Sequence, residues 1–222
     1  MSSFIRFYKE SRVLCMSYFS KIKKEKPQQP PKNWMQALFR DFDIIYIFVV
    51  FLLVYVLLFR VVVVTGDSMN QTLVDGDVLL LASNTVYRNP KQGDIIVASK
   101  DSFRGGECIV KRVIATEGQR VDIDFENRIV SVDGKPLEES YVFFAEDDLR
   151  PMIQEGIAFP QIVPEGCIFV MGDNRNDSQD SRSPSIGFID KREILGKAFF
   201  LVFPGTDDGS IPADYSRIGG LN

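Results

Sequence analysis

A serine within a short polar cluster is the residue of this chain best placed to act as a nucleophile. The cluster covers residues 66–73, with the sequence GDSMNQTL, and it follows closely on a run of four valines at 61–64. Ser68 lies between Asp67 and Met69, and Gly66 gives the backbone freedom to turn. The same residue types are common in ordinary surface turns, so the cluster alone does not decide between a nucleophile and a plain turn.

The absence of histidine restricts what could activate this serine. The chain has no histidine and three cysteines among its 222 residues. A Ser-His-Asp or Cys-His site therefore cannot be built from it, and three scattered cysteines do not form a cysteine-only zinc site. We expect no metal and no cofactor, and any hydrolytic chemistry must use Ser, Thr, Lys, Asp, Glu or Tyr.

Lys111 is the candidate base. It lies in an apolar strand predicted over residues 108–115, where alternation places it on one face with Ile109 and Val113. Covering that face would disfavour the ammonium form and lower the pKa of the amine. A working pKa of about 7–8 costs about 3.5–5 kcal/mol relative to an ordinary lysine, which buried lysines can reach. The alternative is an edge-strand lysine whose amine extends into water.

A third cluster, residues 171–182 with the sequence MGDNRNDSQDSR, is dense in hydrogen-bonding side chains. A solvated loop could have this composition. A calcium loop could also use Asp173, Asp177 and Asp180, but the spacing differs from the EF-hand pattern and no glutamate closes it. The arginines of the cluster indicate internal ion pairs instead.

The segment before Ser68 has the pattern of a membrane anchor. Residues 44–59 form an unbroken apolar run of 16 residues, and the valines that follow extend it past Arg60. The extended run matches the roughly 20 residues that a bilayer core requires, and an arginine near one end can reach the headgroups. Residues 1–43 carry a net charge of +5, which favours a cytoplasmic N-terminus. We therefore expect a cytoplasmic basic tail over 1–41 and a single uncleaved transmembrane anchor over 42–64.

The remaining chain predicts a mainly β protein. Short apolar segments alternate with turn residues over 65–204, too evenly for βαβ units, and Asp133–Gly134 is a hairpin signal. The expected fold is an extracytoplasmic, antiparallel, barrel-like β-sheet domain on one N-terminal transmembrane helix. We expect a variable excursion at 136–165, a short helix within 189–196 and a flexible tail over 205–222. Residues 60–222 carry a net charge of −9, which argues against nucleic-acid binding.

Together, these clusters behind one membrane anchor resemble the bacterial type I signal peptidases. The resemblance covers about residues 42–203 and rests on five matching pieces: SMNQTL at 68–73, GDIIV at 93–97, VKRVIA at 110–115, MGDNR at 171–175 and DSQDSR at 177–182. It implies a serine endopeptidase of the plasma membrane that removes N-terminal signal peptides from exported preproteins. Signal peptides, membrane phospholipid and the translocation machinery are the implied partners.

The resemblance also implies roles for individual residues. Ser68 would attack the scissile carbonyl, and neutral Lys111 would act first as general base and then as general acid. Ser178 would hydrogen-bond to the lysine and orient it. Asp180 and Arg182 would form a structural pair that supports the loop.

The same resemblance places the oxyanion and the substrate. The backbone N–H of Ser68 would serve the oxyanion hole, and because Gly66 stands where some family members have a serine, a second donor would come from the backbone or elsewhere. Gln71 stands where the family commonly has proline, which leaves the turn less stiff. The substrate would pair with strand edges near 62–67 and 108–111, with small pockets for its side chains. The residues expected along it are Asp67, Met69, Ile109 and Val110.

A second interpretation is a non-catalytic extracytoplasmic β-domain that holds exported chains or assists pilus assembly. Such a protein has no need of Lys111, so this lysine discriminates between the two interpretations. A peptidase dedicated to one substrate stays open beside a housekeeping enzyme. A disulfide between Cys108 and Cys167 is permitted by the predicted location but does not follow from the sequence.

Overall fold

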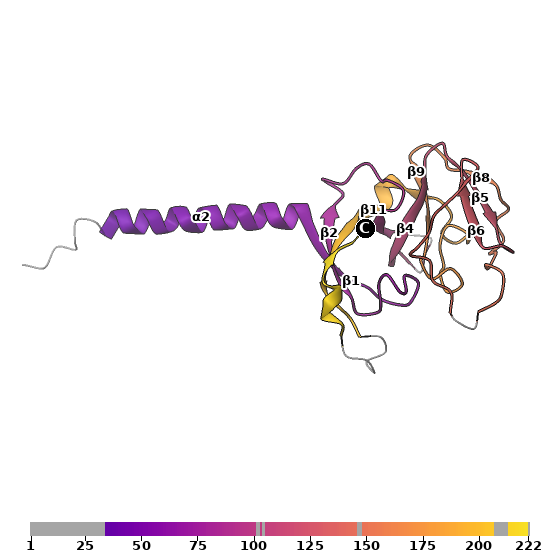
Figure 1. Cartoon of the computed structure of the whole chain (residues 1–222). Coiled ribbons are helices and arrows are strands. Elements are labelled where there is room, and N and C mark those ends of the chain that lie inside the picture. The colour runs from indigo at the N-terminus through magenta and orange to yellow at the C-terminus, as the bar shows by residue number, and fades with distance from the viewer. Residues whose placement is uncertain (1–33, 101–102, 104, 146–147, 207–212, 222) are drawn as a thin grey trace, which may run out of the picture. The chain divides into compact units, whose positions relative to one another are not determined.

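The computed structural model describes residues 34–100, 103, 105–145, 148–206 and 213–221, with side chains from residue 44 onward (Figure 1). It divides into two compact units, residues 1–52 and 53–222. The one long helix of the described chain is α2, Trp34–Leu58. Its large apolar side chains from Ile44 to Leu57 are exposed. Among the residues whose structure is described, no helix combines the length and hydropathy of a membrane span.

The predicted anchor and the structure differ at one end. The helix stops at Leu58, and Phe59–Val63 form strand β1 instead of continuing it. β-Branched valines favour extended backbone, and β1 pairs along its whole length with β2, Val78–Ser83. The last residues of the predicted anchor therefore belong to the β-rich unit.

Two antiparallel sheets make up this unit, so the prediction of a mainly β, antiparallel fold is confirmed. The larger has the strand order β1-β2-β11-β3-β4-β9-β10, with β12 also paired to β11. Its further strands are β3 Ile95–Ser99, β4 Cys108–Thr116, β9 Cys167–Met171, β10 Ile189–Asp190, β11 Ile194–Phe203 and β12 Gly219–Gly220. The smaller sheet has the order β7-β6-β5-β8, with β5 Arg120–Asp124, β6 Ile129–Val132, β7 Lys135–Pro136 and β8 Gln161–Ile162.

The predicted hairpin turn has the expected geometry. Asp133 and Gly134 connect β6 to β7 with φ angles of +52° and +77°. Positive φ at both central residues is the two-residue hairpin turn whose twist matches that of the flanking strands. The Asp-Gly signal is thus confirmed.

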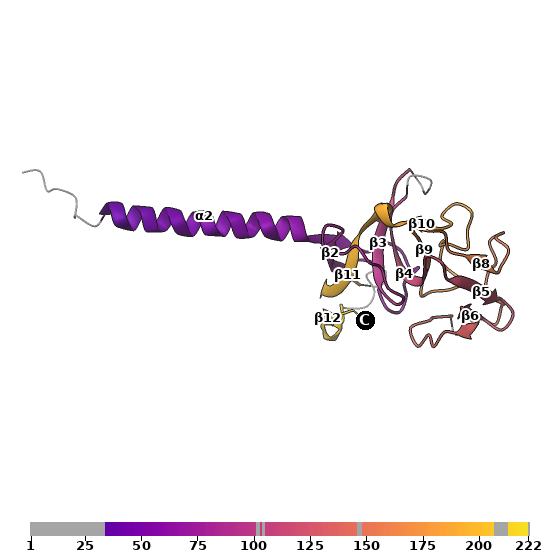
Figure 2. The same ribbon diagram turned by 90° about the horizontal axis from the view of Figure 1, so that it is seen from above.

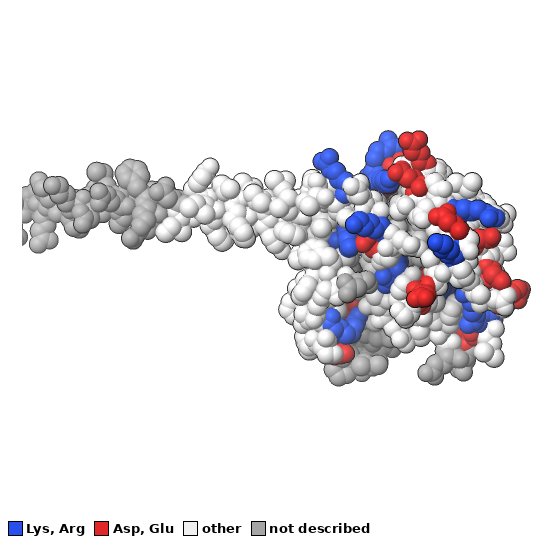
Figure 3. Space-filling view, turned by 45° about the horizontal axis from the view of Figure 1, so that its top comes forward, with Lys and Arg blue, Asp and Glu red and all other residues white. Residues whose placement is uncertain are grey.

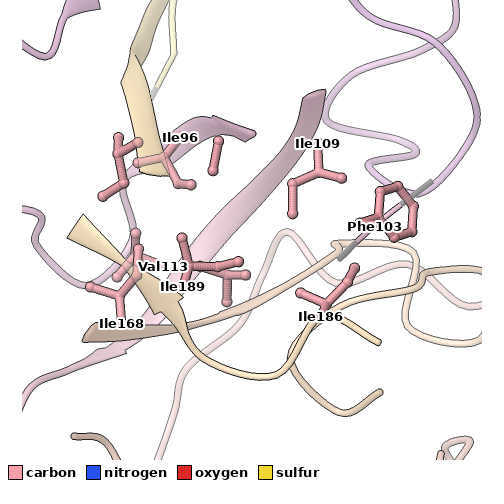
Figure 4. Packing of buried hydrophobic residues seen from close by; sticks show 10 residues of the cluster. Ile96, Phe103, Ile109, Val113, Ile168, Ile186 and Ile189 are labelled. Atoms are coloured by element: carbon pink, nitrogen blue, oxygen red, sulfur yellow. The ribbon is translucent and has the colours of Figure 1, made fainter. Parts of the chain in front are cut away.

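Apolar side chains cover both faces of β4. Ile109 and Val113 lie in a core with Ile96, Ile168 and Ile189 (Figure 4). Ile114, on the opposite face, belongs to a second core that joins the two sheets. A third core lies under β2, β3 and β11 and includes Met69 and Leu73 from the cluster around Ser68. Strand β4 is therefore covered on both faces, which is the condition under which the pKa of Lys111 was expected to fall.

The C-terminal part of the chain differs from the sequence expectation. Of the short helix predicted within 189–196, only Lys191–Glu193 are helical, as one 3-10 turn (η1), and residue 194 already begins β11. The tail predicted to be flexible contains a second 3-10 turn, η2 (Tyr215–Arg217), and strand β12, which pairs with β11 (Figure 2). Backbone hydrogen bonds to an existing sheet hold this glycine-containing segment, which its composition could not indicate.

Two other features complete the description. Cys108 and Cys167 are free thiols, so they do not form the disulfide that the sequence left open. On the face of the β-rich unit in Figure 3, basic and acidic side chains are interspersed rather than gathered into a field of one sign.

Candidate active site

Ser68 and Lys111 meet although 43 residues separate them in the chain. Lys111 Nζ lies 2.5 Å from Ser68 Oγ, at hydrogen-bond distance. Lys111 stands in the middle of β4, opposite Ile96 of β3. Ser68 lies in a turn between β1 and β2, and its side chain is half-buried. A hydroxyl and an amine in contact are what proton transfer from serine to lysine requires.

Burial favours the neutral form of the Lys111 amine. Lys111 is 4% exposed. Desolvation is the largest influence and lowers the pKa of its amine to about 8, while the negative charges of Asp180 and Asp173 raise it and the positive charge of Arg182 lowers it. At pH 7 about one Lys111 in ten is then neutral, against roughly one in 3,000 for an unperturbed lysine.

The nucleophile loop, residues 64–77, is held from within. Met69 and Leu73 point into the third core, where each fully buried side chain contributes about 1.5–3 kcal/mol. The two ends of the loop are joined, because Val64 donates its N–H to the carbonyl of Asp77. Gly66 has a φ of +88° and donates its N–H to Asp75 Oδ1 at 2.7 Å. That N–H is therefore engaged within the loop, and the supporting role predicted for Gly66 stays a prediction.

The third cluster forms a buried loop behind the lysine, the support loop of residues 172–182. Asp180 is fully buried and accepts hydrogen bonds from Arg182 Nε at 2.8 Å and Nη2 at 2.7 Å. It also accepts from Ser178 Oγ at 2.9 Å and from the Gly172 N–H at 3.0 Å. In the described structure the Ser178 hydroxyl therefore donates to Asp180, and its predicted bond to Lys111 stays a prediction.

Asp173 and Asp180 each form an ion pair with an arginine, so the charges of both carboxylates are balanced without calcium. Arg112, adjacent to Lys111 in β4, donates to both carboxylate oxygens of Asp173 at 2.9 and 2.7 Å. Thr72 Oγ1 donates to the same carboxylate at 2.6 Å. The buried Arg112–Asp173 pair thus connects strand β4, the support loop and the nucleophile loop.

Asn174 fixes the backbone of the nucleophile. Its N–H donates to the Ser68 carbonyl at 3.1 Å, and its Nδ2 donates to the Asp67 carbonyl at 3.1 Å. Side-chain and backbone donors of one residue thus hold two successive peptide groups. Sequence analysis assigned Asn174 no role, although its position in the MGDNR piece was the available signal.

The irregular excursion predicted at 136–165 packs against the support loop. Arg175, 1% exposed on its side chain, makes a bidentate ion pair with Glu139, with distances of 2.8 and 2.5 Å. Phe143 donates its N–H to the Asp173 carbonyl and accepts from the Arg175 N–H. These contacts join residues outside the recognised motifs to the site.

A cleft of about 850 Å³ opens beside the Ser68–Lys111 pair. One wall is formed by residues 62–69, a second by residues 107–111, and a third by residues 176–179 with Glu155. Every predicted catalytic, supporting and substrate-binding residue lines this cleft except Asp180 and Arg182. Both of these are buried, at 0% and 1% exposure. Met69 lines the cleft from a buried position in the third core.

Gly172 is a positioning residue that sequence analysis missed. A Cβ there would lie 2.2 Å from Ser178 Oγ and 2.4 Å from the Ser68 carbonyl oxygen. Real Cβ atoms do not approach so closely, so a side chain must displace the nucleophile loop or the support loop. Only glycine lets the two loops come together here.

We expect Gly172→Ala to lower about 100-fold the rate constant of the peptide cleavage that the family resemblance implies, because displacements near 1 Å at a catalytic pair have effects of that size. The overpacked site should also lose about 1–3 kcal/mol of unfolding free energy. Peptide cleavage kinetics and thermal unfolding measure the two effects. Gly219→Ala is the matched control, since a Cβ there meets nothing within 4 Å. Wild-type kinetics in Gly172→Ala would contradict the role assigned to this glycine.

Comparison with known proteins gives the geometry its context. Residues 35–203 match the family model described as "Signal peptidase, peptidase S26". A probable signal peptidase I-1 of Synechocystis is 37% identical over 155 residues, which cover 67% of this chain and 73% of the relative. A signal peptidase I of Bacillus licheniformis is 33% identical over 184 residues, 80% of this chain and 95% of the relative. A crystal structure of signal peptidase I from Enterococcus faecalis, 31% identical, covers 49% of this chain and 96% of its own with a TM-score of 0.38. The chain is an enzyme and belongs to the S26 family of signal peptidases.

Proposed function

We propose that this protein removes N-terminal signal peptides from exported preproteins by a Ser68–Lys111 mechanism. The observation that carries the proposal is the 2.5 Å contact between Ser68 Oγ and the buried Lys111 Nζ beside an open cleft. The family match favours this peptidase over the non-catalytic β-domain. Among the residues described, no group of three or more His, Cys, Asp or Glu side chains is placed to bind a metal.

In the proposed reaction, Ser68 Oγ attacks the scissile carbonyl carbon while its proton passes to Lys111 Nζ. The Ser68 N–H stabilises the oxyanion that forms. Collapse of the tetrahedral intermediate breaks the C–N bond, and the Lys111 ammonium returns the proton to the leaving amine. Water then attacks the ester with Lys111 again as base, which releases the signal peptide and restores the serine.

Two strand edges beside the cleft support substrate binding as an added strand. β1 is the outermost strand of the larger sheet in its order. In the described sheet, β9 pairs only with residues 112–116 of β4, so residues 108–111 are paired to β3 alone. An extended peptide could hydrogen-bond between these edges. Asp67, Met69, Ile109 and Val110 would lie along it, and small pockets would accept small side chains one and three residues before the cut.

The apolar run before the site supports a membrane location. Its large side chains from Ile44 to Leu57 are exposed, and so continuous an apolar surface is stable only in an apolar environment. We propose that residues 42–58 anchor the protein in the plasma membrane, with the tail 1–41 cytoplasmic and the β-rich domain outside. Ser68 follows Leu58 by only ten positions, which keeps the nucleophile near the point where a signal peptide emerges. The translocation machinery would deliver the preproteins.

Incubation of the purified full-length protein with a preprotein, followed by sequencing of the new N-terminus, tests the proposal. We expect wild-type protein to cut the preprotein once, after a small residue that follows the apolar segment of its signal peptide. Ser68→Ala should make no cut. A preprotein left intact by wild-type protein, or cut equally well by Ser68→Ala, would overturn the proposed function.

A further inference from the structure

The C-terminal segment, residues 213–221, contacts the nucleophile loop. Arg217 donates through Nη1 and Nη2 to the two oxygens of Asp77, at 3.0 and 2.7 Å. The same Nη2 lies 3.2 Å from the carbonyl oxygen of Thr72 and donates to it. One guanidinium therefore joins the end of the loop to a point only four residues from Ser68.

Asp77 is built to receive this guanidinium. Its carboxylate is completely buried and also accepts the N–H groups of Val74 at 2.9 Å and Gly205 at 2.7 Å. The Arg217 side chain is 24% exposed, and it is the one charge that neutralises Asp77 within hydrogen-bond distance in the described structure. A buried carboxylate is tolerated when it is paired and fully hydrogen-bonded, and here the C-terminal segment supplies the pairing charge.

The backbone at Gly205, just after β11, also fits closely against the loop. A Cβ at Gly205 would lie 2.0 Å from the Asp75 carbonyl oxygen and 2.5 Å from the Asp77 nitrogen. The backbone passes the loop at a distance that only glycine allows. Pairing of β12 with β11 then fixes the segment that carries Arg217 (Figure 2).

Thr72 is consequently held from two directions. Its hydroxyl donates to Asp173, which lies within the family match, and its carbonyl accepts from Arg217, which lies beyond the match that ends at residue 203. Thr72 and Ser68 belong to the same short turn, in which Leu73 donates its N–H to the Met69 carbonyl. Thr72 is thus linked to Ser68 through this turn.

We propose that Arg217 is a positioning residue for the nucleophile: by bridging Asp77 and the Thr72 carbonyl, it holds Ser68 at the distance from Lys111 that proton transfer needs. The proposal rests on the Ser68–Lys111 mechanism proposed above. It adds the C-terminal segment, outside the matched part of the chain, to the catalytic apparatus.

Preprotein cleavage by full-length Arg217→Ala and Arg217→Lys tests the proposal. Lysine keeps a charge near Asp77, but its single nitrogen cannot reproduce the fork that spans both carboxylate oxygens and the Thr72 carbonyl. We expect kcat to fall about 10- to 100-fold in both variants, with KM changed less than about threefold, because Arg217 itself does not line the cleft. The pH at which the rate inflects should not move, because Arg217 does not contact Lys111.

Arg192→Ala is the matched control, since Arg192 makes a similar two-point pair with Asp190 but is 90% exposed. Its kcat should equal that of the wild type. Wild-type kcat in a folded Arg217→Ala variant, or an equal loss in Arg192→Ala, would overturn the positioning role. If Arg217→Ala is unfolded at the assay temperature, Arg217→Lys decides in the same way. The same assay also compares the wild type with Ser68→Ala. If the wild type cleaves the preprotein and Ser68→Ala does not, the proposed function holds whatever the Arg217 variants do.

Discussion

Replacing Lys111 with methionine should lower kcat/KM for preprotein cleavage on the order of 10⁴-fold, the upper range for loss of a general base. Methionine fills a similar volume without an amine, so Ser68 keeps its surroundings but loses the group that accepts its proton. Initial rates of preprotein cleavage measure the effect. Ser68→Ala should be equally inactive, and the double variant should lose no more than either single one, because the two groups act as a unit.

Stability separates this loss of chemistry from loss of fold. The pKa of Lys111 falls from 10.5 in the unfolded chain to about 8 in the folded one, so the unfolded state binds more protons between these values. Below pH 8 this difference costs the wild type about 3 kcal/mol of unfolding free energy, and the cost disappears as the pH rises toward 10.5. Lys111→Met should therefore unfold at a higher temperature than the wild type at pH 7. The gain in unfolding free energy should be smaller than the pKa shift alone implies, because the variant loses the hydrogen bond between Lys111 and Ser68.

The control is the same substitution at an exposed lysine, Lys135→Met, which should retain wild-type kinetics and stability. Substantial cleavage by Lys111→Met would remove the lysine from the mechanism. A variant that is inactive because it is unfolded at the assay temperature would contradict the expected gain in stability.

Strand alternation indicated that Lys111 would be buried if its face of the strand were covered, because alternation is a strong local rule. Lys111 shares its face with Ile109 and Val113, and both proved to be core residues. Burial of the amine followed from that pattern once a β-sheet was expected. Nothing in the pattern predicted the contact with Ser68, which depends on how two distant segments fold together. The resemblance to a known family supplied that step.

The supporting contacts could not be predicted, for a different reason. Glu139 and Arg217 lie in segments without periodicity, and each forms an ion pair with a residue far away in the chain. Charged residues in irregular segments are usually solvated, so their composition indicates a mobile surface. The boundary of the predicted anchor was displaced for a related reason: Val61–Val63 suit a membrane span and a strand equally well, and pairing with β2 decided the outcome.

The rate of cleavage should rise with pH as the Lys111 amine loses its proton. Because only the neutral amine can accept the Ser68 proton, and burial lowers its pKa to about 8, kcat/KM should increase about tenfold per pH unit below pH 7 and level off above about pH 9. Between pH 6 and pH 9 the total gain should be on the order of 100-fold. A peptide substrate without titratable groups near the cut avoids confusing its ionisation with that of the enzyme.

The direction in which the inflection moves identifies the group that titrates. The negative charge of Asp180 favours the ammonium form of Lys111 and raises its pKa, whereas Arg182 lowers it. Asp180→Asn removes the negative charge and leaves the positive charge of Arg182 unpaired, so the inflection should move to lower pH. The plateau of kcat/KM at high pH should also be lower, because the support loop loses its buried ion pair. A profile that is flat from about pH 5 to 9 would contradict a titrating lysine. An inflection that moves upward in Asp180→Asn would assign the titration to another group, because loss of a nearby anion can only make an ammonium harder to keep.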